Sequence, residues 1–134
     1  MKSPAPATPD VVDRHGRVVI LVEDDTGLRC ALERLLRASG FDARAFASGE
    51  DALVTFHQDK VDCLVVDLNL PAMSGFDLID WLRERHIEVP AVVISAQDEP
   101  RVRAAAHARG VSHFLPKPFP GSALIRALDG FCQR

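Results

Sequence analysis

Five short apolar runs alternate with longer stretches of helical periodicity, and this alternation restricts the chain to one fold class. The runs are RVVILV (17–22), FDARAF (41–46), VDCLVV (61–66), PAVVIS (90–95) and VSHFLP (111–116). Such spacing is typical of parallel strands, because each strand reaches its parallel neighbour through a crossover helix. Right-handed crossovers place helices on both faces of the sheet. The sequence therefore predicts an open, doubly wound α/β domain with a five-stranded parallel sheet.

The helical stretches carry their own start and stop signals. The first has four leucines on one face and a glycine after them: Leu28, Leu32, Leu35, Leu36 and Gly40. The second and third begin with a serine three residues before an aspartate, Ser48 with Asp51 and Ser74 with Asp77, which resembles a capping box. The fourth, near residues 99–109, offers only a thin apolar face. We expect this helix to be held less firmly than the others.

Length and charge exclude several classes of protein. The 134 residues fit one domain, predicted over residues 17–134, preceded by a flexible Pro- and Ala-rich tail over residues 1–16. A net charge of −3 supplies no basic field for phosphate backbones, so direct nucleic-acid binding is not expected. No apolar run approaches the roughly 18 residues of a membrane span, which favours a cytoplasmic protein without membrane contact. Cys30, Cys63 and Cys132 lie in apolar patterns and are predicted to be reduced core thiols.

Polar residues interrupt the apolar runs where the predicted strands end. Glu23 and Asp24 follow the first run, Asp67 the third, Ser95 ends the fourth, and Lys117 follows the fifth. The carboxyl ends of parallel strands share one edge, where open α/β sheets place their functional groups. Carboxylates meeting there at about 5 Å would repel by about 3 kcal/mol per pair at an effective dielectric near 20. The cluster therefore requires cations, and Lys117 supplies only one.

The composition of this cluster indicates the second cation and its chemistry. Oxygen ligands without His or Cys favour Mg²⁺ that keeps several waters, and such an ion is a typical partner of phosphate. Asp67 beside Mg²⁺ and Lys117 is equipped to attack a phosphoryl group. Ser95 could donate a hydrogen bond to a transferred oxygen, and the backbone carbonyl of Asn69 could be a further metal ligand.

Four separated segments, LVEDD, VVDLNLPAMSG, VVISA and FLPKPF, stand in an order and spacing that resemble a known family. They resemble the receiver domain of bacterial two-component response regulators, a CheY-like domain. Within that family, the sequences of these segments are most similar to receivers of the FixJ type. The resemblance covers about residues 17–133. It implies a flavodoxin-like (βα)5 sandwich with helices on both faces of the sheet.

The resemblance implies a role for each matching residue at the carboxyl edge of the predicted sheet. Asp67 corresponds to the phosphoacceptor, and Glu23 and Asp24 to the acid pair that binds Mg²⁺ (or Mn²⁺), Asp24 directly and Glu23 through water. Asn69 would add its backbone carbonyl to the metal. Glu23 departs from the commoner Asp, although its longer side chain should still reach a metal water. Asp25 is an additional acid, which we interpret as the cap of the first helix.

The remaining matches concern the phosphoryl group and the response to it. Ser95, Ala96 and Lys117 would bind the phosphoryl oxygens. Phe114 falls at the aromatic switch position, where its ring would turn inward as Ser95 moves, although an ordinary core Phe is an alternative interpretation. Phe114 also lacks the hydroxyl of the Tyr found in some relatives. The Lys117–Pro118 bond is expected to be cis.

These residues predict a phosphorylation switch rather than an enzyme that turns over substrate. The expected activity is Mg²⁺-dependent phosphotransfer to Asp67 from a sensor histidine kinase, followed by self-dephosphorylation. The readout is expected on the face formed by the fourth helix, fifth strand and fifth helix, which would control a downstream effector protein or output domain and could form a homodimer.

Two other functions fit parts of the pattern. A small phosphatase of the haloacid-dehalogenase kind also uses a strand-end Asp nucleophile with Mg²⁺, Ser or Thr, and Lys. Those enzymes have a second Asp as general acid where this chain has Asn69. A phosphorylation-independent interaction module is the other alternative, and the full set of site residues weighs against it, because such a module needs no cluster of mutually repelling acids.

Overall fold

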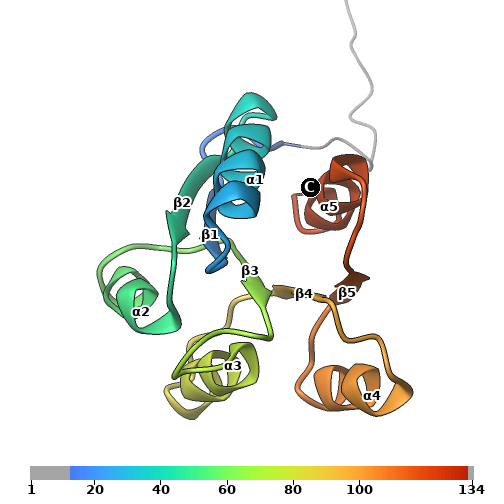
Figure 1. Ribbon diagram of the computed structural model, residues 1–134. Helices are drawn as coiled ribbons and strands as arrows, with labels where there is room; N and C mark the ends of the chain where they lie inside the picture. Colours follow the sequence, from blue (N-terminus) through green and yellow to red (C-terminus); the bar gives the residue numbers. More distant parts are fainter. Residues whose placement is uncertain (1–12, 133–134) are drawn as a thin grey trace, which may run out of the picture.

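The computed structural model describes residues 13–132, in which five strands and five helices alternate (Figure 1). The strands are β1 (Val18–Val22), β2 (Asp42–Phe46), β3 (Cys63–Asp67), β4 (Ala91–Ser95) and β5 (His113–Pro116). The helices are α1 (Thr26–Ala38), α2 (Gly49–Gln58), α3 (Gly75–Glu84), α4 (Pro100–Ala108) and α5 (Gly121–Asp129). Every predicted element is present at its predicted place in the chain.

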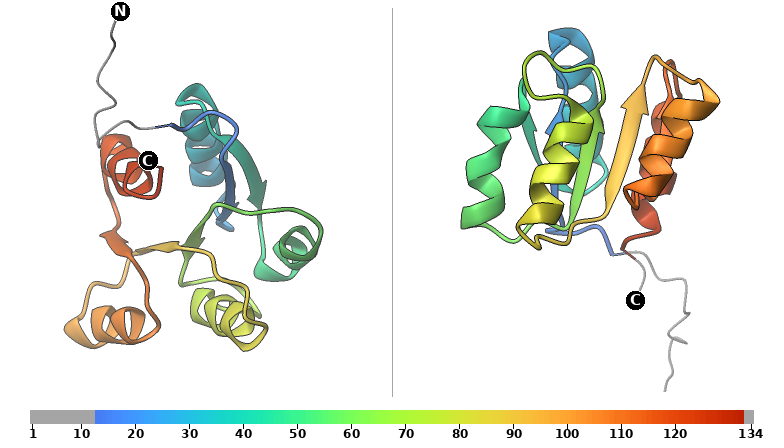
Figure 2. Two further views of the ribbon diagram at one scale, coloured as in Figure 1. Left: turned by 180° about the vertical axis from the view of Figure 1, so that it is seen from behind. Right: turned by 90° about the horizontal axis from the view of Figure 1, so that it is seen from below.

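The five strands form one parallel sheet in the order β2-β1-β3-β4-β5. Helices α1 and α5 lie on one side of the sheet and α2, α3 and α4 on the other, and the two views of Figure 2 agree with this arrangement. The predicted doubly wound α/β fold is confirmed. The order places β1 and β3, the strands that precede the acidic residues, next to each other at the middle of the sheet.

Alternate residues of each central strand enter two separate hydrophobic cores, one on each side of the sheet. In β1, Leu21 belongs to the core under α1 and α5, whereas Ile20 and Val22 belong to the core under α2, α3 and α4. All five residues of β3 and all five of β4 are buried. Burial on both faces explains why these strands read as continuous apolar runs.

Side-chain caps start three of the helices, as the sequence predicted. Asp25 accepts a hydrogen bond from the Leu28 N–H at the start of α1. Ser74 and Asp77 form a complete capping box at the start of α3. Ser48 accepts from the Asp51 N–H at the start of α2, and only this half of a box is formed there.

The helices α1, α3 and α4 end in the same hydrogen-bonded turn, in which one residue adopts a left-handed conformation. That residue is Gly40 after α1 and Gly110 after α4, with φ of 103° and 76°. After α3 it is His86, with φ of 57°. The His86 N–H donates to the Arg83 carbonyl and the Ile87 N–H to the Leu82 carbonyl, both at 3.0 Å. The turn is thus complete, but its left-handed residue carries a side chain.

We expect His86→Gly to stabilise the domain by about 0.5–1 kcal/mol, because glycine adopts this conformation without steric cost. Denaturant unfolding measures the effect. Gly110→Ala is the opposite control, since a Cβ there would meet no atom within 4 Å and only the backbone conformation would be penalised. A His86→Gly protein less stable than wild type would contradict the prediction.

Helix α4 is weakly anchored, as its thin apolar face predicted. Ala106 is its one buried residue, and Val102 is only partly buried. Its N-cap residue, Glu99, forms no side-chain cap hydrogen bond. Few buried contacts mean a low free energy for local movement of this helix.

The N-terminal segment and the thiols differ in part from the expectations. Residues 1–12 of the predicted tail lie outside the described residues, whereas Arg14, also assigned to the tail, forms a bidentate ion pair with Asp129 at 2.7 Å. Cys63 and Cys132 are buried thiols as predicted, but Cys30 is exposed. The prediction for Cys30 was wrong because this residue lies on the outer face of α1, away from its buried leucines.

In the described part of the chain, no helix is both long and apolar enough to cross a bilayer.

Candidate functional site

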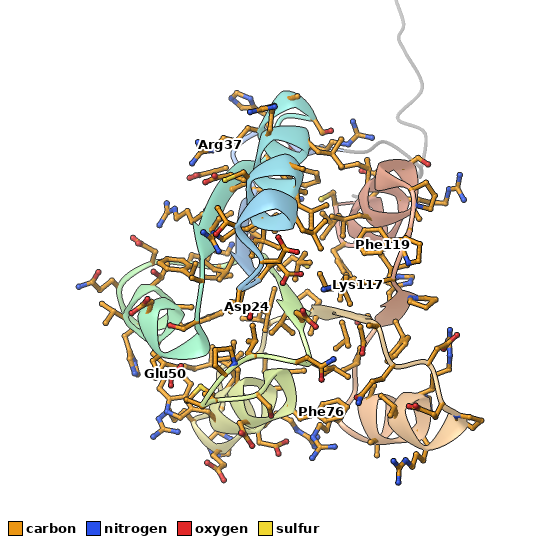
Figure 3. All side chains as sticks on the ribbon, viewed as in Figure 1. Asp24, Arg37, Glu50, Phe76, Lys117 and Phe119 are labelled. Carbon is orange, nitrogen blue, oxygen red and sulfur yellow. The ribbon has the colours of Figure 1, made fainter. Side chains whose placement is uncertain are left out.

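The polar residues that end the strands meet at one edge of the sheet, as predicted. The register of β1 with β3 sets Glu23 at the level of Asp67. The registers of β3 with β4 and of β4 with β5 bring Ser95 and Lys117 to the same edge. In Figure 3, Asp24 and Lys117 lie near the middle of the sheet edge, whereas Arg37 lies at the periphery.

Lys117 bridges two buried carboxylates. Its Nζ lies 2.8 Å from Asp67 Oδ2 and 2.8 Å from Glu23 Oε1. Glu23 is fully buried and Asp67 is 3% exposed, whereas Lys117 is partly open to solvent. Residues separated by 94 positions in the chain therefore share one ion-pair network. One lysine for two buried carboxylates leaves the network short of positive charge.

Burial and charge perturb both ends of this network. Burial of the Glu23 carboxylate raises its pKa, and the negative charge of Asp67 acts in the same direction, although hydrogen bonds from Lys117 and from the Asp25 N–H oppose the rise. Burial alone would lower the pKa of Lys117, but its hydrogen bonds to Asp67 and Glu23 outweigh burial, so this pKa is raised. The Glu23 carboxylate is therefore ionised at a cost that an additional cation would reduce.

In protein free of divalent cations, we expect Glu23 to titrate above its usual pKa, and NMR of the side-chain carboxyl carbons measures this. A raised folded-state pKa means that the contribution of Glu23 to stability is fully present below the unfolded pKa and is lost as pH rises through the folded pKa. Lys117→Met should raise the pKa of Glu23 further, because it removes a hydrogen bond that lowers it. A wild-type Glu23 pKa at or below the usual value would contradict the prediction.

Three carboxylates offer a set of ligand atoms for a cation. One oxygen from each of Glu23, Asp24 and Asp67 lies within 4.8 Å of the other two. Asp24 is exposed, so the set is open to solvent on that side. Hard oxygen donors with excess negative charge fit Mg²⁺ or Mn²⁺. Asn69 is exposed next to this set, and its N–H donates to Asp67 Oδ1 at 3.0 Å.

Ser95 and Ala96 lie beside the acids at the end of β4. Ser95 is fully buried, and its Oγ accepts a hydrogen bond from the Gln97 N–H at 2.9 Å. This bond leaves the hydroxyl hydrogen of Ser95 free to donate elsewhere. Ala96 is exposed at the rim. The Lys117 N–H donates to the Ser95 carbonyl at 2.8 Å, which ties the ends of β4 and β5 together.

Phe114 and Pro118 complete the set of predicted residues. The Lys117–Pro118 bond is cis, which confirms that prediction. Phe114 is partly buried against the core under α2, α3 and α4. The Arg103 guanidinium lies 4.7 Å above its ring, and Arg103 is also paired with Asp98. The ring of Phe114 is therefore covered by a side chain of the weakly anchored α4.

The structure adds two residues whose importance the sequence did not reveal. Gly75 is the first residue of α3 and packs directly on the backbone at the end of β3. A Cβ at Gly75 would lie 2.5 Å from the carbonyl oxygen of Asp67. Arg29 on α1 donates hydrogen bonds to the carbonyls of Glu23 and Asp24. No local sequence pattern distinguishes Arg29 from other helical arginines.

A comparison against known families agrees with this fold. A family model described as the response regulator receiver domain matches residues 19–129. The chain belongs to this family. The resemblance carried by the four sequence segments is thereby confirmed, and the matched family is one of signalling receivers rather than of phosphatases.

Individual relatives support the assignment. The transcriptional regulatory protein PrrA of Mycobacterium tuberculosis is 32% identical over 116 residues, which cover 87% of this receiver and 50% of PrrA. The non-phosphorylated HemR receiver domain of Leptospira biflexa superposes with a TM-score of 0.80 at 27% identity, covering 87% of this receiver and 94% of that chain. Chemotaxis protein CheY4 of Vibrio cholerae, at 24% identity and a TM-score of 0.81 over 87% of this receiver and 98% of that chain, shares the fold. This receiver spans about half the length of PrrA.

Proposed function

We propose that this receiver accepts a phosphoryl group on Asp67 from the phosphohistidine of a sensor histidine kinase, acting in the cytoplasm. The observation that carries the proposal is the buried Asp67 carboxylate at the carboxyl end of β3, with Lys117 Nζ at 2.8 Å and the acids Glu23 and Asp24 beside it. A fold that served only as a binding module would gain stability from losing this cluster.

The residues present would hold one hard divalent cation, Mg²⁺ or Mn²⁺. Glu23, Asp24 and Asp67 would supply side-chain oxygens, and Asn69 its backbone carbonyl. The bound ion supplies charge neutralisation for the oxygens of the transferred phosphoryl group. Its binding would also neutralise the negative charge of the carboxylates that Lys117 alone leaves unbalanced.

The transfer is a displacement at phosphorus. A carboxylate oxygen of Asp67 forms a bond to phosphorus as the phosphorus–nitrogen bond of the phosphohistidine breaks, and the imidazole leaves with the electron pair. Lys117, already 2.8 Å from Asp67 Oδ2, pairs with a phosphoryl oxygen. The Ser95 hydroxyl and the Ala96 N–H donate to the others. Self-dephosphorylation reverses the modification when water attacks the same phosphorus.

The signal passes from this site to the α4–β5–α5 face. When Ser95 turns toward the phosphoryl group, its hydrogen bond from the Gln97 N–H at 2.9 Å must change. That change frees space near Phe114, whose ring moves inward, and α4 follows because Ala106 is its one fully buried residue. A downstream effector protein, an output domain or a second copy of the receiver would recognise the altered face.

Incubation with acetyl phosphate and Mg²⁺, followed by mass spectrometry of peptides, tests the proposal. We expect one phosphoryl group per chain, located on Asp67. No labelling is expected when a chelator removes Mg²⁺ from the incubation. Phosphate located mainly on another residue would overturn the assignment. A partner that binds wild type and Asp67→Ala equally would favour the interaction-module alternative, and steady hydrolysis of small phosphate esters would favour a phosphatase.

A further inference from the structure

Arg29, on the first turns of α1, contacts the backbone that carries the acid pair. Its Nη1 donates to the Glu23 carbonyl at 2.9 Å and to the Asp24 carbonyl at 3.2 Å. The Arg29 N–H donates to the Asp25 carbonyl at 2.8 Å. One residue thus provides donors for three consecutive carbonyls at the turn from β1 into α1.

These carbonyls need such a donor because the sheet ends just before them. Strand β1 ends at Val22, and the Glu23 N–H still donates to the Phe46 carbonyl of β2 at 3.0 Å. Past that bond the backbone turns away from the ladder, and backbone carbonyls at such a turn require other partners. Glu23 is therefore held through its N–H by the sheet and through its carbonyl by Arg29.

Arg37 provides a comparison on the same helix. Its guanidinium also donates to a backbone carbonyl, that of Ala43 in β2, at 3.1 Å. Arg37 lies at the periphery, away from Asp24 and Lys117 (Figure 3). Both arginines tie α1 to neighbouring backbone by the same kind of bond, although Arg37 also forms an ion pair with Glu33 at 2.9 Å. Effects that belong only to Arg29 therefore report on the acid pair.

We propose that Arg29 is a positioning residue, which fixes the backbone of Glu23 and Asp24 so that both carboxylates face Asp67 before a cation binds. The inference rests on the proposed function at Asp67. It assigns to Arg29 the preorganisation of the metal ligands and no contact with the phosphoryl group.

Calorimetric titration with Mg²⁺ on the wild type, Arg29→Met and Arg37→Met tests this assignment. Loss of a group that orients metal ligands typically costs about tenfold or more in affinity, so we expect the dissociation constant for Mg²⁺ to rise about tenfold in Arg29→Met. Arg37→Met should stay within about twofold of the wild type, because its lost bonds are remote from the ligands. Acetyl phosphate labelling should need more Mg²⁺ in Arg29→Met but reach a maximal rate near that of the wild type.

Hydrogen exchange in metal-free protein gives a second readout that does not depend on phosphorylation. Amides of residues 23–26 should exchange faster in Arg29→Met and at the wild-type rate in Arg37→Met. Arg29→Ala, which removes the same side-chain donors and has the highest helix propensity, replaces the Met variant if that protein does not fold. An unchanged Mg²⁺ affinity, or an equal loss in Arg37→Met, overturns the inference. A wild type that neither binds Mg²⁺ nor accepts phosphate overturns the proposed function instead, and the exchange rates then still decide the role of Arg29.

Discussion

Asp67→Asn is expected to lower the rate of labelling by acetyl phosphate at least about a hundredfold, because an amide lacks the nucleophilic oxygen that forms the bond to phosphorus. The substitution keeps the size of the side chain and its acceptor oxygen. Asp67 Oδ1 accepts from the Asn69 N–H at 3.0 Å, and the Asn amide oxygen can accept the same bond. The fold should therefore persist, which far-ultraviolet circular dichroism checks, and phosphate incorporation measured by mass spectrometry gives the rate.

Asp25→Asn is the matched control for this variant. It removes one negative charge from the same edge of the sheet, but Asn can still cap α1 by accepting from the Leu28 N–H. Its labelling rate should lie within about threefold of the wild type, because Asp25 is not among the carboxylates that converge with Asp67. Equal losses in the two variants would mean that general charge at this edge, rather than Asp67 itself, governs labelling.

Gly75→Ala is expected to destabilise the domain by about 3 kcal/mol, because an added Cβ cannot fit without moving the backbone at the end of β3. That Cβ would lie 2.5 Å from the Asp67 carbonyl oxygen and 2.9 Å from Leu68 Cα. Both atoms belong to the backbone at the end of β3, so no side-chain rotation relieves the clash. Chemical unfolding measures the loss, and labelling of Asp67 should slow in the protein that remains folded.

Gly27→Ala makes the same chemical change near the start of α1 and should act in the opposite direction. A Cβ there would meet only Asp25 Oδ1, at an ordinary contact distance of 3.5 Å. Alanine favours a helix over glycine by up to about 1 kcal/mol, so a small gain in stability is expected. Equal stability of the two alanine variants would show that the close approach at Gly75 is not a constraint.

Much of the fold was predictable from local pattern, because burial of a parallel sheet on both faces demands apolar runs of strand length. The same reasoning predicted the candidate site. Asp67 ends a buried run, and a charge at that position is costly unless the residue lies at the carboxyl edge of the sheet. The convergence of Glu23, Asp24 and Lys117 on it followed from parallel topology, before any side-chain contact was known.

The missed features all depend on which atoms meet. Cys30 lies in an apolar sequence pattern, as the buried thiols do, but it is on the outer face of α1 and exposed. His86 ends α3 in a left-handed conformation that glycine supplies in two other helices, and no local pattern distinguishes it. Arg29 resembles any exposed helical arginine until its bonds to the carbonyls of Glu23 and Asp24 are seen.

The amino-acid sequence by itself determined the class of the fold, the edge at which the acids gather and the family to which the receiver belongs. These depend on periodicity and on the order of residues along the chain. Only the tertiary structure decided that Lys117 bridges Glu23 and Asp67, that Gly75 must lack a side chain and that Arg29 holds the turn of the acid pair. Hydrogen bonds and steric exclusion act over about 3 Å, and distances of that size are set by packing of the whole domain rather than by local pattern.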